Sequence, residues 1–136
     1  MNLLSCPVKR IILATTKIYN APVLYVNGYF YTIGGNFWSK GNNDQRIARL
    51  NAKILQWNTE YEGFGKLVNG RQGHNAIFNS DHIIVVGGNT TPTERCKIST
   101  TKVTCQIQAP SLTDYYGFPA LFLVPGDYCK PNFSLS

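Results

Sequence analysis

Short runs of apolar residues, broken by turn-forming residues, make up most of this 136-residue chain. The runs are rich in valine, isoleucine, tyrosine and phenylalanine, which favour strands. No segment repeats an apolar position every three or four residues, as an amphipathic helix requires. The pattern therefore predicts an all-β protein. Its predicted strands are Val23–Val26, Tyr29–Ile33, Ile47–Leu50, Ile54–Trp57, Asn75–Phe78, His82–Val86, Arg95–Ser99 and Lys102–Ile107.

Turn residues connect these strands into hairpins. Asn27-Gly28 separates the first two strands and is a favoured two-residue hairpin turn. Asn51-Ala52-Lys53 separates the next two strands. Two successive hairpins follow again between residues 75 and 107, so each half of the pattern predicts a four-stranded antiparallel sheet.

The two sets of strands are copies of one repeat. The segment GYFYTIGG, residues 28–35, corresponds to DHIIVVGG, residues 81–88, at an offset of 53 residues. At this offset apolar positions meet apolar positions, and turn positions meet turn positions. A third copy begins at Pro119–Phe122, which aligns with Asn75–Phe78. Repeated four-stranded sheets with a period of about 50 residues are typical of propeller blades.

Composition and charge narrow the possible functions. Hydrophobic residues make up 43% of the chain and charged residues only 15%, which agrees with a β-rich domain. The formal net charge is +6, but no run of basic residues is longer than two. We therefore expect a mildly basic surface rather than a nucleic-acid site. No segment is long enough to span a bilayer, and MNLLSCPVKR at the N-terminus lacks the pattern of a signal peptide. Either the protein is cytosolic or its gene starts upstream.

Several motifs resemble the kelch repeats. Ile33–Gly35 and Val86–Gly88 each carry an apolar strand end followed by two glycines, as in that family. Leu50 and Trp57 match the residues expected on the third and fourth strands of the first copy. Arg71–His74 reads Arg-x-Gly-His, a common opening of a kelch unit. The resemblance implies a segment of a kelch-type β-propeller, with two four-stranded antiparallel blades and flanking strands.

The resemblance also divides the chain. Residues 1–21 are expected to hold a strand remnant of a preceding blade, 22–70 the first blade, 71–114 the second and 115–136 part of a third. A propeller ring needs about four to eight blades, so this ring is not closed. The chain is a fragment, or other copies supply the missing blades, or the propeller is open. We expect a fragment.

The motif residues are expected to have structural roles. The paired glycines let the second strand of each blade end in a sharp redirection, and they present no side chain where backbones approach closely. No helix start or Gly-Lys-Ser/Thr follows them, so they do not form a phosphate loop. The residues assigned structural roles are Gly34, Gly35, Trp57, Arg71, Gly73, His74, Gly87 and Gly88.

Two cysteines are expected to face each other. If Thr100-Thr101 forms the turn, Cys96 lies opposite Cys105 in a non-hydrogen-bonded pair, where side chains come closest. The two cysteines occupy the positions where the kelch resemblance implies an aromatic pair. This geometry accepts a disulfide, although two reduced, buried cysteines fit the pattern as well. The spacing of the two cysteines does not match a zinc site.

Two N-glycosylation sequons are relevant to the cellular location of the protein. Asn89-Thr90-Thr91 and Asn132-Phe133-Ser134 are candidate glycosylation sites at Asn89 and Asn132. Together with the cysteine pair they favour an extracellular protein, and a cytoplasmic one is the alternative.

The expected function is that of a non-catalytic protein-interaction module. The pair Phe37 and Trp38 lies in a polar, glycine-rich insertion and is a candidate anchor for an unidentified protein partner. The alternative is part of a galactose-oxidase-like or sialidase-like enzyme whose site lies in missing blades. Some kelch-like propellers bind copper, but His74 and His82 do not form a recognisable ligand set. We expect no cofactor, no metal and no catalytic group in this chain.

Overall fold

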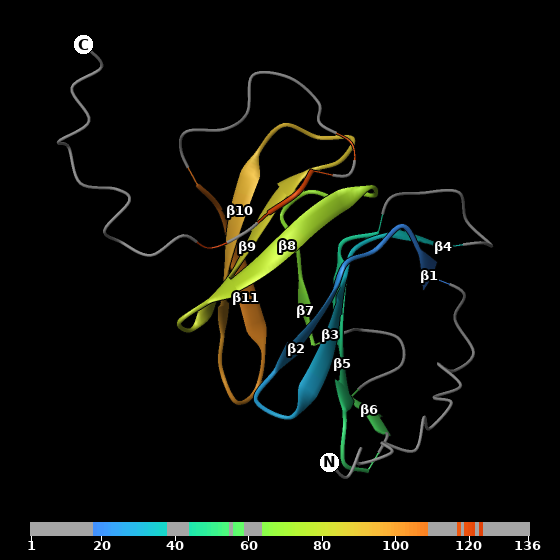
Figure 1. Ribbon diagram of the computed structural model, residues 1–136, viewed down its shortest axis with the longest axis vertical. Coiled ribbons are helices and arrows are strands. Elements are labelled where there is room, and N and C mark those ends of the chain that lie inside the picture. The colour runs from blue at the N-terminus through green and yellow to red at the C-terminus, as the bar shows by residue number, and fades with distance from the viewer. Residues whose placement is uncertain are drawn as a thin grey trace, which may run out of the picture.

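The computed structural model describes residues 18–37, 44–54, 56–58, 64–108, 117, 119–121 and 123. All regular structure in these ranges is β, which confirms the predicted all-β class (Figure 1). The strands are β1 (Ile18–Tyr19), β2 (Val23–Val26), β3 (Tyr29–Ile33), β4 (Asn36–Phe37), β5 (Arg46–Asn51), β6 (Gln56–Asn58), β7 (Gly65–Lys66), β8 (His74–Asn79), β9 (His82–Gly87), β10 (Thr93–Ile98) and β11 (Val103–Gln108).

The eight strands expected from the sequence are present. Strands β2 and β3 have the predicted bounds, and the turn Asn27-Gly28 between them has positive φ at both residues, as a type I′ turn requires. Strand β6 starts two residues later than predicted. The Asn51 side-chain oxygen accepts hydrogen bonds from the N–H groups of Lys53 and Ile54, which extends the turn at the expense of the strand.

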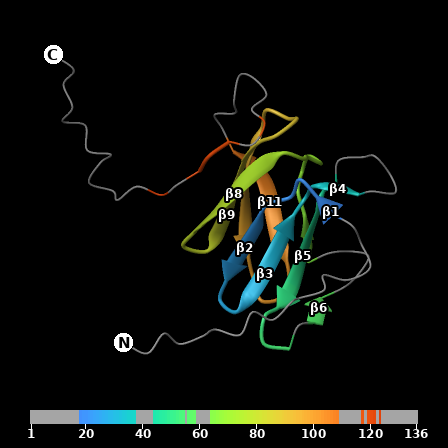
Figure 2. The ribbon, with the colours of Figure 1, turned by 45° about the vertical axis from the view of Figure 1, so that its right-hand side comes forward.

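Four strands form each repeat unit. The first unit consists of β2, β3, β5 and β6, and the second consists of β8, β9, β10 and β11; every neighbouring pair within a unit is antiparallel. Figures 1 and 2 show the first unit in blue to green and the second in yellow-green to orange.

A short strand that the sequence did not predict joins the two units. Strand β7 pairs antiparallel with β5 and parallel with β11, so a single mixed sheet replaces the two separate antiparallel sheets expected. Gly65 allows this pairing, because a Cβ at its position would collide with the backbone of Val103. The edge strands β2 and β8 contact each other, so the sheet is a nearly closed barrel.

The core lies between the two units. Side chains from β3 and β5 pack against side chains from β9, β10 and β11. Two further side chains, Phe64 and Leu67, come from the segment that follows β6. The buried cluster contains Val26, Tyr31, Ile33, Ile47, Phe64, Leu67, Ala76, Ile83, Val85, Cys96 and Val103.

The two units pack head to tail. In β3 the residues Tyr31 and Ile33 face the core, and their equivalents 53 residues later are Ile84 and Val86. In β9, however, the core residues are Ile83 and Val85. Because successive residues of a strand point to opposite faces, the first unit uses one face of the repeat and the second unit uses the other.

Candidate functional site

Both glycine pairs border the segment that connects the units. All four glycines of the pairs 34–35 and 87–88 have positive φ, which residues with a side chain rarely adopt. The N–H of Gly35 donates to the carbonyl of Arg71 at 2.8 Å. A Cβ on Gly88 would lie 2.5 Å from the carbonyl oxygen of Gln72. The paired glycines therefore let the backbone of residues 71–74 pass close to the ends of β3 and β9.

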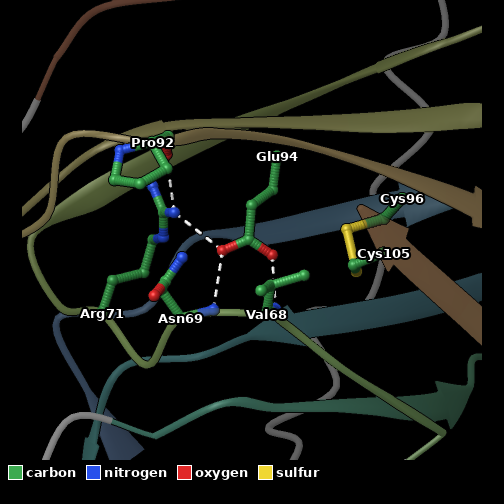
Figure 3. The surroundings of a disulfide bond; sticks show 7 residues. All are labelled: Val68, Asn69, Arg71, Pro92, Glu94, Cys96 and Cys105. Atoms are coloured by element: carbon green, nitrogen blue, oxygen red, sulfur yellow. Dashed lines mark hydrogen bonds and ion pairs between the residues drawn. A yellow bond between two sulfur atoms is a disulfide. The ribbon is translucent and has the colours of Figure 1, made fainter. Parts of the chain in front are cut away.

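The Arg71 side chain crosses into the second unit. It is completely buried, and its guanidinium donates to the carbonyl of Gly87 at 3.2 Å and to that of Pro92 at 2.7 Å. It also forms an ion pair with the Glu94 carboxylate at 2.7 Å (Figure 3). One residue thus binds the first glycine pair through its backbone and the second through its side chain.

Glu94 completes the arrangement. Its carboxylate accepts hydrogen bonds from the N–H groups of Val68 (2.6 Å) and Asn69 (3.0 Å), as well as from Arg71 (Figure 3). Burial lowers the pKa of the Arg71 guanidinium, and the charge of Glu94 acts in the opposite direction. We call this pair the Arg71–Glu94 clamp, because it fixes the connection between the units with two mutually neutralised charges.

His74 makes a second link between the units. Its Nε2–H donates to the carbonyl of Ile33 at 2.8 Å, and the buried Nδ1 atom has no hydrogen-bond partner among the residues that the structure describes. Burial, and next the positive charge of Arg71, lower the pKa of His74 to about 4. The imidazole is therefore neutral at physiological pH and acts as a hydrogen-bond donor to the end of β3.

The neutral state of His74 predicts a pH-dependent stability. Its pKa is about 4 in the folded protein, and about 6.5 in an unfolded chain, so the unfolded state binds more protons between these values. The contribution of His74 to the free energy of unfolding is then fully present above pH 6.5 and decreases as the pH drops towards 4. We expect a loss of about 2 kcal/mol between pH 7.5 and pH 5 from this group. Urea denaturation at both pH values measures it.

The variant His74→Gln is the control for this prediction. Glutamine does not titrate and keeps an amide N–H donor for the carbonyl of Ile33. The difference in stability between the two pH values should shrink by most of that amount. An equal difference in both proteins would show that other groups cause the pH dependence.

Gly73 and Trp57 have packing and backbone contacts. The N–H of Gly73 donates to the carbonyl of Asn20 at 3.0 Å, which brings the start of β8 next to the start of β2. Trp57 is half-buried and lies opposite the buried Leu50 across β5 and β6. The contacts of Gly73 and Trp57 are thus with the strands of the barrel and their connections.

Cys96 and Cys105 form a disulfide bond. They are Cα partners across β10 and β11, in the register derived from the sequence. By the repeat alignment they take the places of Leu50 and Trp57 in the first unit. The atoms that could ligate a metal in Glu94 and the two cysteines lie within 4.8 Å of one another, but the sulfurs are bonded to each other and offer no thiolate.

The described binding and glycosylation candidates, Phe37 and Asn89, are not members of the Arg71–Glu94 clamp. Phe37 ends β4, which pairs with β1, while Trp38 and Asn132 are outside the described residues. Asn89 is exposed, and its side-chain oxygen accepts a hydrogen bond from the N–H of Gln72 at 3.0 Å.

The two histidines do not form a ligand pair. His74 is the Cα partner of Gly87 at one end of the β8–β9 hairpin, and His82 is the partner of Asn79 at the other. His82 contacts Arg95 instead, with a distance of 3.3 Å between the two side chains.

The contacts of two buried residues, Glu94 and Arg49, were not predicted from the sequence. Glu94 was not singled out, although it shares the inward-facing positions of β10 with Cys96, where a charge needs a partner. Arg49 lies in the interior of the barrel, stacked 4.1 Å from the ring centre of Tyr29 and 3.7 Å from that of Phe64. A signal for Glu94 is its position two residues before Cys96, because alternate residues of a strand point to the same face.

Comparison with family models and with curated proteins gave no match. Among the described segments, no helix is long and apolar enough to cross a membrane.

Proposed function

We propose that this chain is a kelch-type β-propeller segment that serves as a non-catalytic protein-interaction module. The observation that supports the proposal is the head-to-tail packing of two equivalent four-stranded units. In such packing each unit presents one face to its predecessor and the opposite face to its successor, as the blades of a propeller do.

The use of the motif residues supports a scaffold rather than a reaction centre. The Arg71 guanidinium is bound by two carbonyls and by Glu94, whose carboxylate also accepts two backbone N–H groups. The Nε2–H of His74 is bound by the carbonyl of Ile33. These charged and polar groups serve to join the two units, and their contacts are made within the protein.

The binding surface in this proposal is the insertion that follows the first glycine pair. Phe37 is the Cα partner of Ile18, and Tyr19 is the partner of Asn36, so β1 and β4 form a small separate sheet at the base of the insertion. An aromatic pair in a loop next to a sheet can serve as an anchor for a protein partner.

The double variant Phe37→Ser/Trp38→Ser tests this function. A protein partner captured from extracts of the native host is titrated against the wild type and the variant by calorimetry. We expect the variant to bind at least about tenfold more weakly, as loss of an aromatic anchor does. Ile54→Ser, which changes an exposed turn residue, should bind like the wild type. Equal affinities of the wild type and the double variant would contradict the proposal.

The disulfide is compatible with an extracellular setting. We place the module outside the cell, where the exposed Asn89 is available to glycosylation. Mass spectrometry of protein from its native host should then show the Cys96–Cys105 bond and a glycan on the Asn89 peptide. Free thiols together with an unmodified Asn89 would place it in the cytosol.

A further inference from the structure

The first unit has an apolar outer face that is equivalent to a buried one. Val23 and Tyr25 of β2 correspond to Ala76 and Phe78 of β8, which pack in the core between the units. Yet Val23 is 54% exposed and Tyr25 is 63% exposed. The face defined by the exposed Val23 and Tyr25 and the half-buried Phe30, here called the front face, therefore has the chemistry of an interface.

The second unit has the complementary outer face. Ile77, Ile84 and Val86 correspond to Leu24, Tyr31 and Ile33, which lie in or against the core. In the second unit these positions point away from the core and are half-buried. We call the face defined by Ile77, His82, Ile84, Val86 and Arg95 the back face.

The polar part of the back face follows the same equivalence. Arg49 lies over Tyr29 on the packed side of the first unit. By strand register, Arg95 corresponds to Arg49 and His82 to Tyr29, and the Arg95 and His82 side chains are again in contact. The back face thus repeats the cation and ring that the first unit places in the interface between the units.

From this equivalence we infer that the front face of one chain docks on the back face of a second copy. The contact reproduces the packing between the two units inside one chain, with Tyr25 in the place of Phe78 and Ile84 in the place of Tyr31. This inference rests on the proposed propeller architecture and names a second copy of the chain as the source of further blades. Because the two faces differ, the contact is heterologous, and repeated contacts close a ring if the rotation allows it. A ring of about four to eight blades needs about two to four copies of two units each.

Two variants, one for each face, test the inference by sedimentation velocity. Tyr25→Lys changes only the front face and Ile84→Lys only the back face. We expect the wild type to form a species larger than a monomer, and each variant alone to be a monomer. Mixed in equal amounts, the variants should form a dimer of twice the monomer mass, because each retains one intact face.

The outcomes separate the possible arrangements. A wild type that stays monomeric over a concentration series to about 100 μM, a range that covers ordinary specific association, would overturn the inference. So would a mixture that stays monomeric, or an Ile84→Lys variant that assembles like the wild type, as expected for a symmetric contact through the front face. If Ile84→Lys does not fold, Thr104→Arg changes an exposed position on the same face and takes its place.

Ile54→Lys is the charge-matched control. It adds the same charge at an exposed turn residue on neither face and should assemble like the wild type. Partner binding is measured separately on the monomeric Tyr25→Lys variant. A wild type that does not self-assemble, together with intact partner binding, would overturn the docking of copies alone, whereas a wild type that self-assembles without partner binding would overturn the proposed function alone.

Discussion

Replacing Arg71 by methionine is expected to lower the free energy of unfolding by about 3–5 kcal/mol, since it leaves a buried carboxylate without its counter-charge. Methionine fills much of the volume of the arginine stem but cannot bind the carbonyls of Gly87 and Pro92 or neutralise Glu94. The connection between the units then loses the contacts that hold it. Urea denaturation at pH 7, followed by tryptophan fluorescence, measures the change.

A double variant separates the loss of the ion pair from the loss of packing. In Arg71→Met/Glu94→Met neither charge of the clamp remains buried, so we expect it to be more stable than Arg71→Met alone. Lys97→Met, which removes an exposed cation from the same strand as Glu94, should change stability by less than about 0.5 kcal/mol. If Arg71→Met costs no more than Lys97→Met, the Arg71–Glu94 clamp does not stabilise the fold.

Gly88→Ala is expected to cost about 3 kcal/mol, from the positive φ and from steric overlap together. The residue has a φ of 87°, and an added Cβ would lie 2.5 Å from the carbonyl oxygen of Gln72 and 3.0 Å from Cβ of His74. The backbone carbonyl cannot move without disturbing the Arg-x-Gly-His segment. Thermal and urea denaturation of the variant measure the loss.

Gly28→Ala isolates the conformational part of that effect. Gly28 has nearly the same φ, 85°, but nothing lies within 4 Å of an added Cβ. It should cost only about 1–2 kcal/mol, which is the strain of a side chain in the left-handed region. Equal losses in the two variants would mean that the close approach of the connecting segment to the glycine pair has no energetic consequence.

Most of the strand arrangement was predictable from local patterns. Alternation and the Asn27-Gly28 turn fixed β2 and β3 to the residue, and counting outward from Thr100-Thr101 fixed the partners Cys96 and Cys105. These features depend on neighbouring residues, so the sequence contains them directly. The kelch resemblance itself stays a prediction.

The contacts that link the two units were harder to predict from the sequence. Strand β7 has two residues, too few for a periodic pattern, and its pairing depends on the close contact of Gly65 with Val103 on the neighbouring strand β11. The pairing of Arg71 with Glu94 joins residues 23 positions apart that come together only when the second unit packs on the connection. Arg71 could be recognised by its motif, whereas its partner could not.

The disulfide gives the two ends of the array different dependence on their surroundings. In the first unit the β5–β6 hairpin is held by the side-chain pair of Leu50 and Trp57, whose hydrophobic packing does not depend on redox conditions. In the second unit a covalent bond between Cys96 and Cys105 has replaced that pair. A reducing milieu would therefore remove the covalent link between β10 and β11, and the second unit would then rely on the pairing of β11 with β10 and β7 and on the burial of Val103. In the described part of the chain, the first unit has no such link and its packing does not depend on the oxidation state of the environment.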